Sequence, residues 1–384
     1  MEPLTFRAPL DEYRRQAQEL VDGHRTGDSA AIKIIHENHP RFLDETITWR
    51  PKFMSSADIQ KASFDDDDAR LALARWYTFA DWTALEEYVD AVSVDGPVFR
   101  FESAVEAVVN GDLATLQALL RDHPELIRAR STRRTPHDPP VHAATLLHYV
   151  AANGVEGHRQ KTPSNAVEIT RTLLEAGAEV DATAGMYGGQ YATMSMLVSS
   201  AHPAIAGLQA PLAELLLDSG AAIEGLGSEQ WKSPLMTALA FGYLDTADAL
   251  VRRGARVSTV AAAAGLGRLA DATRLLPQAD ALDRHRAIAL AAQMGHAEIV
   301  RLLLDAGEDP NRYNPDGNHG HSTPLHQAAF AGHENVVRLL VERGAKLDIR
   351  DTVWHGTPLG WALHSGKPKQ LAIAAYLREH GASD

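Results

Sequence analysis

The apolar positions between Ser322 and Asp351 predict two short antiparallel helices. The segment TPLHQAA (323–329) opens with a capping threonine and a proline, which suit the first turn of a helix, and it places small apolar residues on one face. The segment VVRLLV (336–341) gives a second helix a bulkier apolar face, and Gly332 and Gly344 stand where the two helices end. Because a helix pair this short cannot bury its apolar faces alone, it has to stack on similar neighbours.

Weaker copies of this unit fill most of the chain. The glycines that end the units stand at positions 177, 220, 254, 307, 344 and 381, at intervals of 43, 34, 53, 37 and 37 residues. A unit of about 33 residues explains the intervals of 34 and 37 residues directly. The interval of 43 residues is one unit with an insertion, and the interval of 53 residues is two units, one of them short. With its TPLH opening and its Gly-Ala ending, the unit resembles the ankyrin repeat. The resemblance implies an all-α solenoid of stacked helix pairs with an N-terminal helical capping region.

The pattern divides the chain into two expected domains. Residues 1–95 form the N-terminal helical region, and residues 100–384 form the repeat array, irregular over 134–232 and regular over 233–384. The segment 129–144, rich in arginine, proline and histidine, is expected to project as a loop. Two adjacent irregular repeats carry insertions, at 155–165 and 201–209, which are predicted to lie side by side on one edge.

The N-terminal region contains a second recognisable segment. Residues 65–92, DDDDARLALARWYTFADWTALEEYVDAV, resemble a helical pair found ahead of the array in many bacterial ankyrin-repeat proteins. Their aromatic residues are predicted to form a core that caps the first repeat. The acids from Asp65 to Asp68 are candidates for a cation site, but placement at the positive end of a helix dipole is favoured. Residues 39–60 show no pattern that places them.

Composition narrows the classes of partner. The 384 residues contain 37 Lys and Arg against 50 Asp and Glu, a net charge of −13, which argues against a nucleic acid or an anionic membrane as the main partner. The absence of cysteine excludes disulfides and thiolate sites. Because the sequence shows neither a secretory signal nor an apolar run long enough to span a bilayer, an acidic cytoplasmic protein is expected.

The glycine-rich stretch TAGMYGGQYAT (183–193) is the least regular connection and carries Tyr187, Gln190 and Tyr191. Glycines between aromatic residues would let a ligand approach the backbone closely. The same residues also suit a tight hairpin with packed tyrosines, and the sequence leaves both alternatives open. The stretch lacks the glycine and lysine spacing of a phosphate-binding loop.

The two insertions bring polar and cationic side chains onto an acidic protein. Arg159 and Lys161 lie in the first insertion and His202 in the second. Such a patch would bind a carboxylate or a phosphate group, so a small anionic ligand is one predicted partner. The competing and favoured interpretation is that both insertions are ordered loops that close the side of the stack.

Most of the 18 histidines are predicted to belong to the framework. His326, His333 and His296 occupy positions where the repeat uses histidine to bridge backbone groups of neighbouring units, and His148 aligns with His326.

A second group, His319, His321 and His355, is a weak candidate for zinc ligation because these residues lie on neighbouring loops. No carboxylate spacing completes the set, so a solvated polar loop is favoured. No metal and no cofactor are predicted.

Two tryptophans are predicted to be exposed anchors for a partner. Trp231 and Trp354 fall in or next to connecting hairpins, where a large amphipathic side chain suits a binding surface. The leading hypothesis is therefore a binding or scaffold protein that recognises a protein or peptide through the concave face of the array.

The alternative hypothesis is an enzyme or small-molecule binder with a pocket formed by the irregular repeats at 134–232. Its acid–base groups would be Tyr187, His148 and His202, and Arg159 would hold an anion. The sequence contains no complete catalytic motif, so it does not decide for an enzyme. A third hypothesis is an assembly role, in which the aromatic N-terminal region meets another chain.

Overall fold

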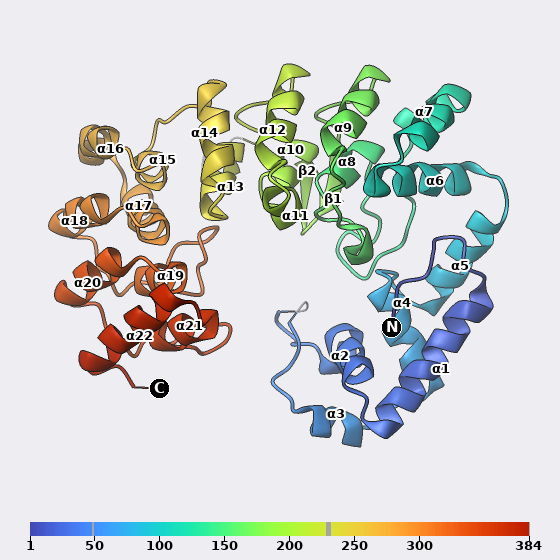
Figure 1. Ribbon diagram of the computed structural model, residues 1–384, viewed down its shortest axis with the longest axis horizontal. Coiled ribbons are helices and arrows are strands. Elements are labelled where there is room, and N and C mark those ends of the chain that lie inside the picture. The colour runs from blue at the N-terminus through green and yellow to red at the C-terminus, as the bar shows by residue number, and fades with distance from the viewer. Residues whose placement is uncertain (48–49, 228–231, 384) are drawn as a thin grey trace. The chain divides into compact units, whose positions relative to one another are not determined.

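The computed structural model describes residues 1–47, 50–227 and 232–383 (Figure 1). The chain divides into two compact units, residues 1–221 and 222–384. The first unit contains the N-terminal helices and the irregular repeats, and the second contains the regular repeats. Both units are helical, as predicted, and none of the described helices has the length and apolar character needed to cross a lipid bilayer.

The described part of the N-terminal region contains the α-helices α1 (Leu10–Thr26), α2 (Ser29–Asn38), α3 (Ser56–Lys61), α4 (Asp66–Trp76) and α5 (Trp82–Ser93). Gly27 has the left-handed conformation (φ 76°) that ends α1, and the Asp28 side chain caps α2. Asp65 caps α4 by accepting from the backbone N–H groups of Asp67 and Asp68. The acidic run therefore starts a helix, which is the favoured of its two interpretations.

Aromatic side chains fill the core of this region, as the sequence predicted. The buried aromatic members are Tyr77, Phe79 and Tyr88, next to the buried Leu85, and Trp76 and Trp82 pack against them. Residues 39–60, which no pattern placed, contain a short helical turn at Pro40–Phe42 and helix α3. They close over a small separate core of Ile32, Ile35, Phe42 and Ile59.

The irregular repeats complete the first unit. Their helices are α6 (Pro97–Asn110), α7 (Leu113–Asp122), α8 (Leu146–Val150), α9 (Ala166–Glu175), α10 (Thr193–Leu197), α11 (Ala201–Ile205) and α12 (Gln209–Asp218). Strands β1 (Thr183–Met186) and β2 (Gly189–Ala192) pair antiparallel ahead of α10. Their turn residues Tyr187 and Gly188 both have positive φ, 50° and 72°, which suits a two-residue hairpin. The glycine-rich stretch is thus a tight hairpin, one of the two alternatives that its sequence left open.

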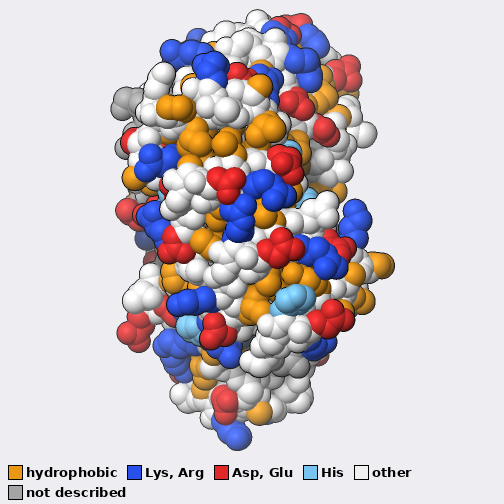
Figure 2. All heavy atoms as spheres, turned by 90° about the vertical axis from the view of Figure 1, so that its left-hand side faces the viewer, with side chains coloured by type: hydrophobic (Ala, Val, Ile, Leu, Met, Phe, Trp, Pro, Cys, Tyr) orange, Lys and Arg blue, Asp and Glu red, His pale blue; other side chains and the backbone are white. Residues whose placement is uncertain are grey.

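The described residues of the second unit form five helix pairs, which stack in two layers (Figure 1). The first helices are α13 (Pro234–Ala240), α15 (Val260–Gly265), α17 (Ala281–Met294), α19 (Pro324–Ala331) and α21 (Pro358–Ser365). The second helices are α14 (Leu244–Arg252), α16 (Leu269–Leu275), α18 (Ala297–Asp305), α20 (Glu334–Glu342) and α22 (Pro368–Glu379). Small residues such as Ala261 and Ala291 are fully buried in the first layer, where they let neighbouring helices approach closely. On the face that carries α16, α18, α20 and α22, acidic and basic side chains are intermixed (Figure 2).

Single side chains tie each regular repeat to the next. His326 Nδ1 lies 2.8 Å from Thr323 Oγ1 in its own repeat, and its Nε2 donates to the carbonyl oxygen of Gly356 at 3.1 Å. His333 Nε2 donates to the carbonyl oxygen of Gln293 in the preceding repeat at 2.9 Å. The predicted framework role of these two histidines is confirmed.

Candidate functional site

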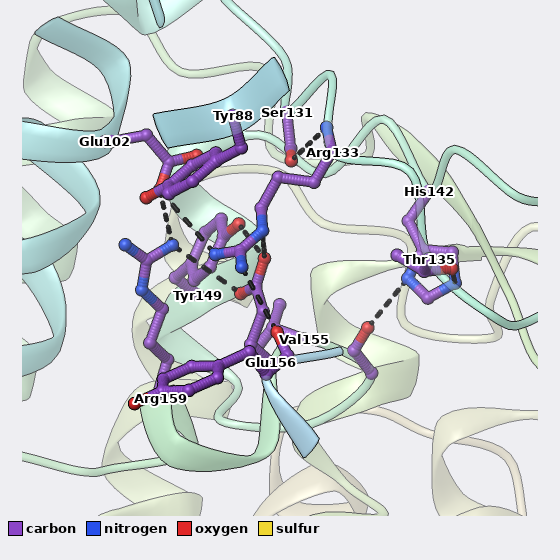
Figure 3. Close-up of polar contacts among 12 residues, drawn as sticks. Tyr88, Glu102, Ser131, Arg133, Thr135, His142, Tyr149, Val155, Glu156 and Arg159 are labelled. Carbon is purple, nitrogen blue, oxygen red and sulfur yellow. Dashed lines mark hydrogen bonds and ion pairs between the residues drawn. The ribbon is translucent and has the colours of Figure 1, made fainter. Parts of the chain in front are cut away.

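The first insertion turns inward and forms a buried ion cluster (Figure 3). Arg159, at the end of the short turn Gly157–Arg159, is 1 % exposed. Its Nη1 donates to Glu102 Oε2 of α6 at 2.6 Å, and its Nε donates to Glu106 Oε1 at 3.0 Å. The insertion thus connects α8 back to the preceding repeat, and Arg159 does not face solvent.

A second buried arginine joins the cluster from the segment that was expected to project as a loop. Arg133 Nε lies 3.2 Å from Glu156 Oε1, and Arg133 Nη2 donates to the carbonyl oxygen of Tyr77 at 3.2 Å. The guanidinium lies over the rings of Phe79 and Tyr88, at 4.1 and 4.6 Å from their centres. The expectation of a projecting loop is wrong for this part of 129–144, because Arg133 packs against the N-terminal helices.

Two tyrosines complete the cluster and define its electrostatics. Tyr88 Oη donates to Glu102 at 3.0 Å, and Tyr149 Oη donates to Glu156 at 3.4 Å. Burial alone would raise the pKa of the Glu156 carboxyl, but Arg133 and Arg159 hold that pKa below its usual range. Burial raises the pKa of the Tyr149 hydroxyl well above its usual range. At neutral pH the cluster therefore contains paired charges and neutral tyrosines.

The space beside the cluster is too small for an organic substrate. A cavity of about 10 Å³, lined among others by Ser131, Thr135 and His142, lies next to Arg133 and Glu156. That is about the volume needed by one water molecule. The cluster consequently connects the N-terminal helices with the first repeats, and its residues Glu102, Arg133, Glu156 and Arg159 are buried.

The hairpin residue Tyr187 begins a chain of polar contacts across the irregular repeats. Tyr187 is 67 % exposed, and its Oη donates to Asn153 Oδ1 at 2.9 Å. Asn153 Nδ2 donates in turn to Ser199 Oγ at 2.9 Å. The turns after α8 and α10 therefore lie side by side, whereas the first insertion continues away toward α6.

The remaining residues proposed for the irregular repeats have separate surroundings. His148 is fully buried between Thr145 Oγ1 and the carbonyl oxygen of Tyr191, and burial lowers the pKa of its imidazole to about 4. Lys161, Gln190 and His202 are exposed.

The structure thus brings His148 to Tyr191 and Tyr187 to Asn153, but it places Arg159 in the ion cluster. An acid–base or ligand-binding role for these residues stays a prediction.

A wide surface depression that no motif indicated lies between α1 and α3. Its volume is about 590 Å³, with Val21 and Phe64 among its apolar lining residues and Arg25 and Lys61 among its basic ones. The residues that line it come from α1, from α3 and from the segment after α3, without a repeated spacing, so no sequence pattern marks them.

The three histidines considered for zinc do not form a metal site in the described part of the chain. His319 Nε2 donates to the carbonyl oxygen of Ala240 at 2.9 Å, and the His321 ring packs at 5.0 Å from the Trp354 ring. His355 is exposed. Among the described residues no group of three His, Asp or Glu side chains is placed to hold a metal ion.

Trp354 belongs to a connected group of rings in the last two repeats, which we call the aromatic cluster: His321, Phe330, Trp354 and Trp361. Trp361 lies 5.8 Å from Phe330 and 6.2 Å from Trp354, measured between ring centres. Phe330 is 46 % exposed and Trp354 51 % exposed. The other predicted anchor, Trp231, lies outside the described residues.

A buried carboxylate fixes the geometry of this cluster. Asp351 Oδ1 accepts from the backbone N–H of Trp354 at 2.6 Å, and Oδ2 accepts from Trp361 Nε1 at 3.0 Å. Asp351 Oδ2 also accepts from Gly356 N–H at 2.8 Å. Burial works to raise the pKa of Asp351, but these hydrogen bonds lower it below its usual range. The carboxylate therefore stays charged and holds the backbone of Trp354 and the indole of Trp361.

Comparison with known proteins agrees with the repeat geometry. The family model of ankyrin repeats (3 copies) matches residues 259–351 and 317–384. The cyclin-dependent kinase inhibitor 2A of Monodelphis domestica is 33% identical over 121 residues, which cover 30% of this chain and 67% of that protein.

Longer relatives match over only a small part of their length. The inactive serine/threonine-protein kinase TEX14 of Mus musculus is 35% identical over 92 residues, 24% of this chain and 6% of that protein. The ankyrin repeat and KH domain-containing protein mask-1 of Caenorhabditis elegans is 23% identical over 342 residues, 87% of this chain and 12% of that protein. These relatives are eukaryotic, so a bacterial source stays a prediction. The helix pairs, the histidine bridges and these matches together show that the chain belongs to the ankyrin-repeat proteins.

Proposed function

We propose that this protein binds a partner protein through the inner surface of its second unit. The inner surface is the side of α13, α15, α17, α19 and α21 that faces away from the second helices. The aromatic cluster would provide the main contact. The observation that carries the proposal is that Trp354 is half exposed although Asp351 holds its backbone and the neighbouring Trp361 in place.

Such an arrangement suits binding for two reasons. Tryptophan is among the residues that contribute most to protein–protein affinity, because its large ring buries much apolar area. An indole that is already held in position also loses little conformational freedom when a partner packs on it. Trp354 and Phe330 therefore offer apolar area that this unit leaves uncovered.

The charge of the two units supports recognition by contact rather than by long-range attraction. The second unit contains 17 Lys and Arg and 18 Asp and Glu, a net charge of −1, whereas the first contains 20 and 32, a net charge of −12. An almost neutral unit steers a partner only weakly through its field. Shape and apolar contact would thus determine which partner binds the second unit.

A site-specific cross-linking experiment tests the proposal. A photoreactive phenylalanine analogue would replace Trp354 in one variant and Leu371 of α22, which is 48 % exposed, in a control variant. We expect irradiation in cells to produce a defined protein adduct at position 354 and none at position 371. Equal adducts at both positions, or none at either, would contradict the proposal.

A further inference from the structure

Residues 314–321, which we call the strap, lie in the connection between α18 and α19 and fold back beside the first helices of the second unit (Figure 1). Residues 306–323 separate these two helices, whereas only residues 253–259 separate α14 from α15. The longer connection is an ordered turn, because Asn314 N–H donates to the carbonyl oxygen of Ser322 at 2.7 Å and Asn318 N–H donates to that of Pro315 at 3.0 Å.

The strap reaches a helix 79 positions earlier in the sequence, since His319 Nε2 donates to the carbonyl oxygen of Ala240 at 2.9 Å. Gln293 Nε2 of α17 donates to the same oxygen at 2.9 Å. Ala240 is the last residue of α13, where helical carbonyl groups have no partner within their own helix. His319 thus spans from the strap to the end of α13.

A buried arginine of α17 forms the second anchor of the strap. Arg286 is 7 % exposed, and its Nε donates to Asn318 Oδ1 at 3.1 Å. Its Nη2 donates to the carbonyl oxygen of Asp316 at 3.3 Å. Because a buried guanidinium needs acceptors for its N–H groups, the strap satisfies a requirement that α17 itself creates.

Polar contacts hold residues 316–319 of the strap in place, and at its end the ring of His321 packs 5.0 Å from the ring of Trp354. Its sequence, NPDGNHGH, has Pro315 as its one apolar side chain. His319 has φ 58°, a left-handed conformation that is uncommon outside glycine. Hydrogen bonds to protein exchange with hydrogen bonds to water at a small net change in free energy, so the strap opens more easily than a packed helix.

We infer that the strap is a built-in competitor for the inner surface, occupying its α13 to α17 part until a partner displaces it. This inference rests on the proposed function. A displacing segment has to replace what the strap offers, namely an amide or carboxamide oxygen for Arg286 and an N–H donor for the carbonyl oxygen of Ala240. The partner that fits is therefore a protein with a polar turn. This turn would lie next to the partner side chains that cover the aromatic cluster.

The first test measures whether these anchors hold the strap. The chain has no cysteine, so Asp316→Cys in the strap and Asp248→Cys on α14 provide two unique positions for spin labels. We expect one narrow distance population by pulsed electron spin resonance, which becomes broad when Asn318→Ala and His319→Ala are added. The control Arg301→Ala on α18 should leave the population narrow. An unchanged distribution in the anchor variant would overturn the inference.

The second test measures whether the strap competes for the surface. The probe is a cyclised synthetic peptide of residues 312–323, added to the full chain and to a variant in which two glycines replace 314–321. We expect the peptide to bind the shortened variant at least tenfold more tightly than the full chain, and to lose this advantage when the peptide carries Asn318→Ala and His319→Ala.

Equal binding to both proteins would overturn the strap as a competitor. Phe330→Ala, made in the variant that carries the photoreactive analogue at position 354, separates this outcome from the proposed function. It should abolish cross-linking of the partner but leave the peptide affinity unchanged.

Discussion

The two units connect neighbouring helix pairs by different chemistry. In the second unit, alanine-rich faces pack together, and side chains such as His333 and Gln370 bond carbonyl groups of the neighbouring repeat. In the first unit, the joint between the N-terminal helices and the first repeats is a buried cluster that includes Glu102, Arg133, Glu156 and Arg159. Similar repeats can use the same kind of contact at every junction, whereas a junction between unlike elements needs a specific set of contacts. The ion cluster is such a junction.

The largest loss of stability should follow when one charge of the ion cluster is removed. Arg159→Met leaves the carboxylate of Glu102 buried without its closest cation, which should destabilise the first unit by about 3 to 5 kcal/mol. Urea unfolding followed by circular dichroism would measure the loss. The matched control is Arg128→Met, whose ion pair with Glu179 is exposed and should contribute less than about 1 kcal/mol. Similar losses in the two variants would show that the cluster is not a structural joint.

Acid should weaken both units through their buried histidines, and the first unit also contains His158, whose pKa burial lowers to about 3. Burial lowers the pKa of His148 and of His326 to about 4. An unfolded imidazole takes up its proton near pH 6.5, so the stabilisation is complete above that pH and is lost progressively as the pH falls toward 4. His148 and His326 should each account for a loss of about 2 kcal/mol between pH 7 and pH 5.

Urea midpoints at pH 7, 6 and 5 would measure this loss. His326→Gln should flatten the pH dependence of the second unit only. A pH dependence that is unchanged in this variant would assign the effect to other groups.

The smallest effect is expected at the single contacts between repeats. Asn165 Nδ2 donates to the carbonyl oxygen of Gly111 at 2.9 Å in the first unit, and His333 makes the equivalent contact in the second. Asn165→Ala and His333→Ala should each cost about 1 kcal/mol in the free energy of unfolding. Calorimetry on both variants would check whether the two losses in the free energy of unfolding are equal. A clearly larger cost for Asn165→Ala would mean that the irregular repeats depend on this contact more than the regular ones.

The sequence predicted the helix pairs well because their apolar spacing and end signals are local. The histidine bridges were predictable because His326 and His333 stand at the bridging positions of the repeat that the unit resembles, although their partners lie 30 and 40 positions away. The hairpin at Tyr187 and Gly188 could be recognised only as one of two alternatives.

The ion cluster was not predictable from local pattern. Arg159 and Glu102 are 57 positions apart, and no repeat spacing relates them. One signal was available, because Glu102 stands beside Phe101 on a helix whose neighbouring positions are apolar and buried. A charged residue on an apolar helix face indicates a buried partner, but it does not say which one. The strap escaped prediction in the same way, since its contacts depend on how distant repeats stack.

The ion cluster also sets an order for folding during synthesis. Glu102 leaves the ribosome well before Arg133, Glu156 and Arg159, because the chain emerges from its amino end. Until those residues follow, the core around Tyr88 cannot close over Glu102 without burying an unpaired charge. The N-terminal helices therefore complete their packing only after the first insertion has been made, which couples the start of the chain to its middle.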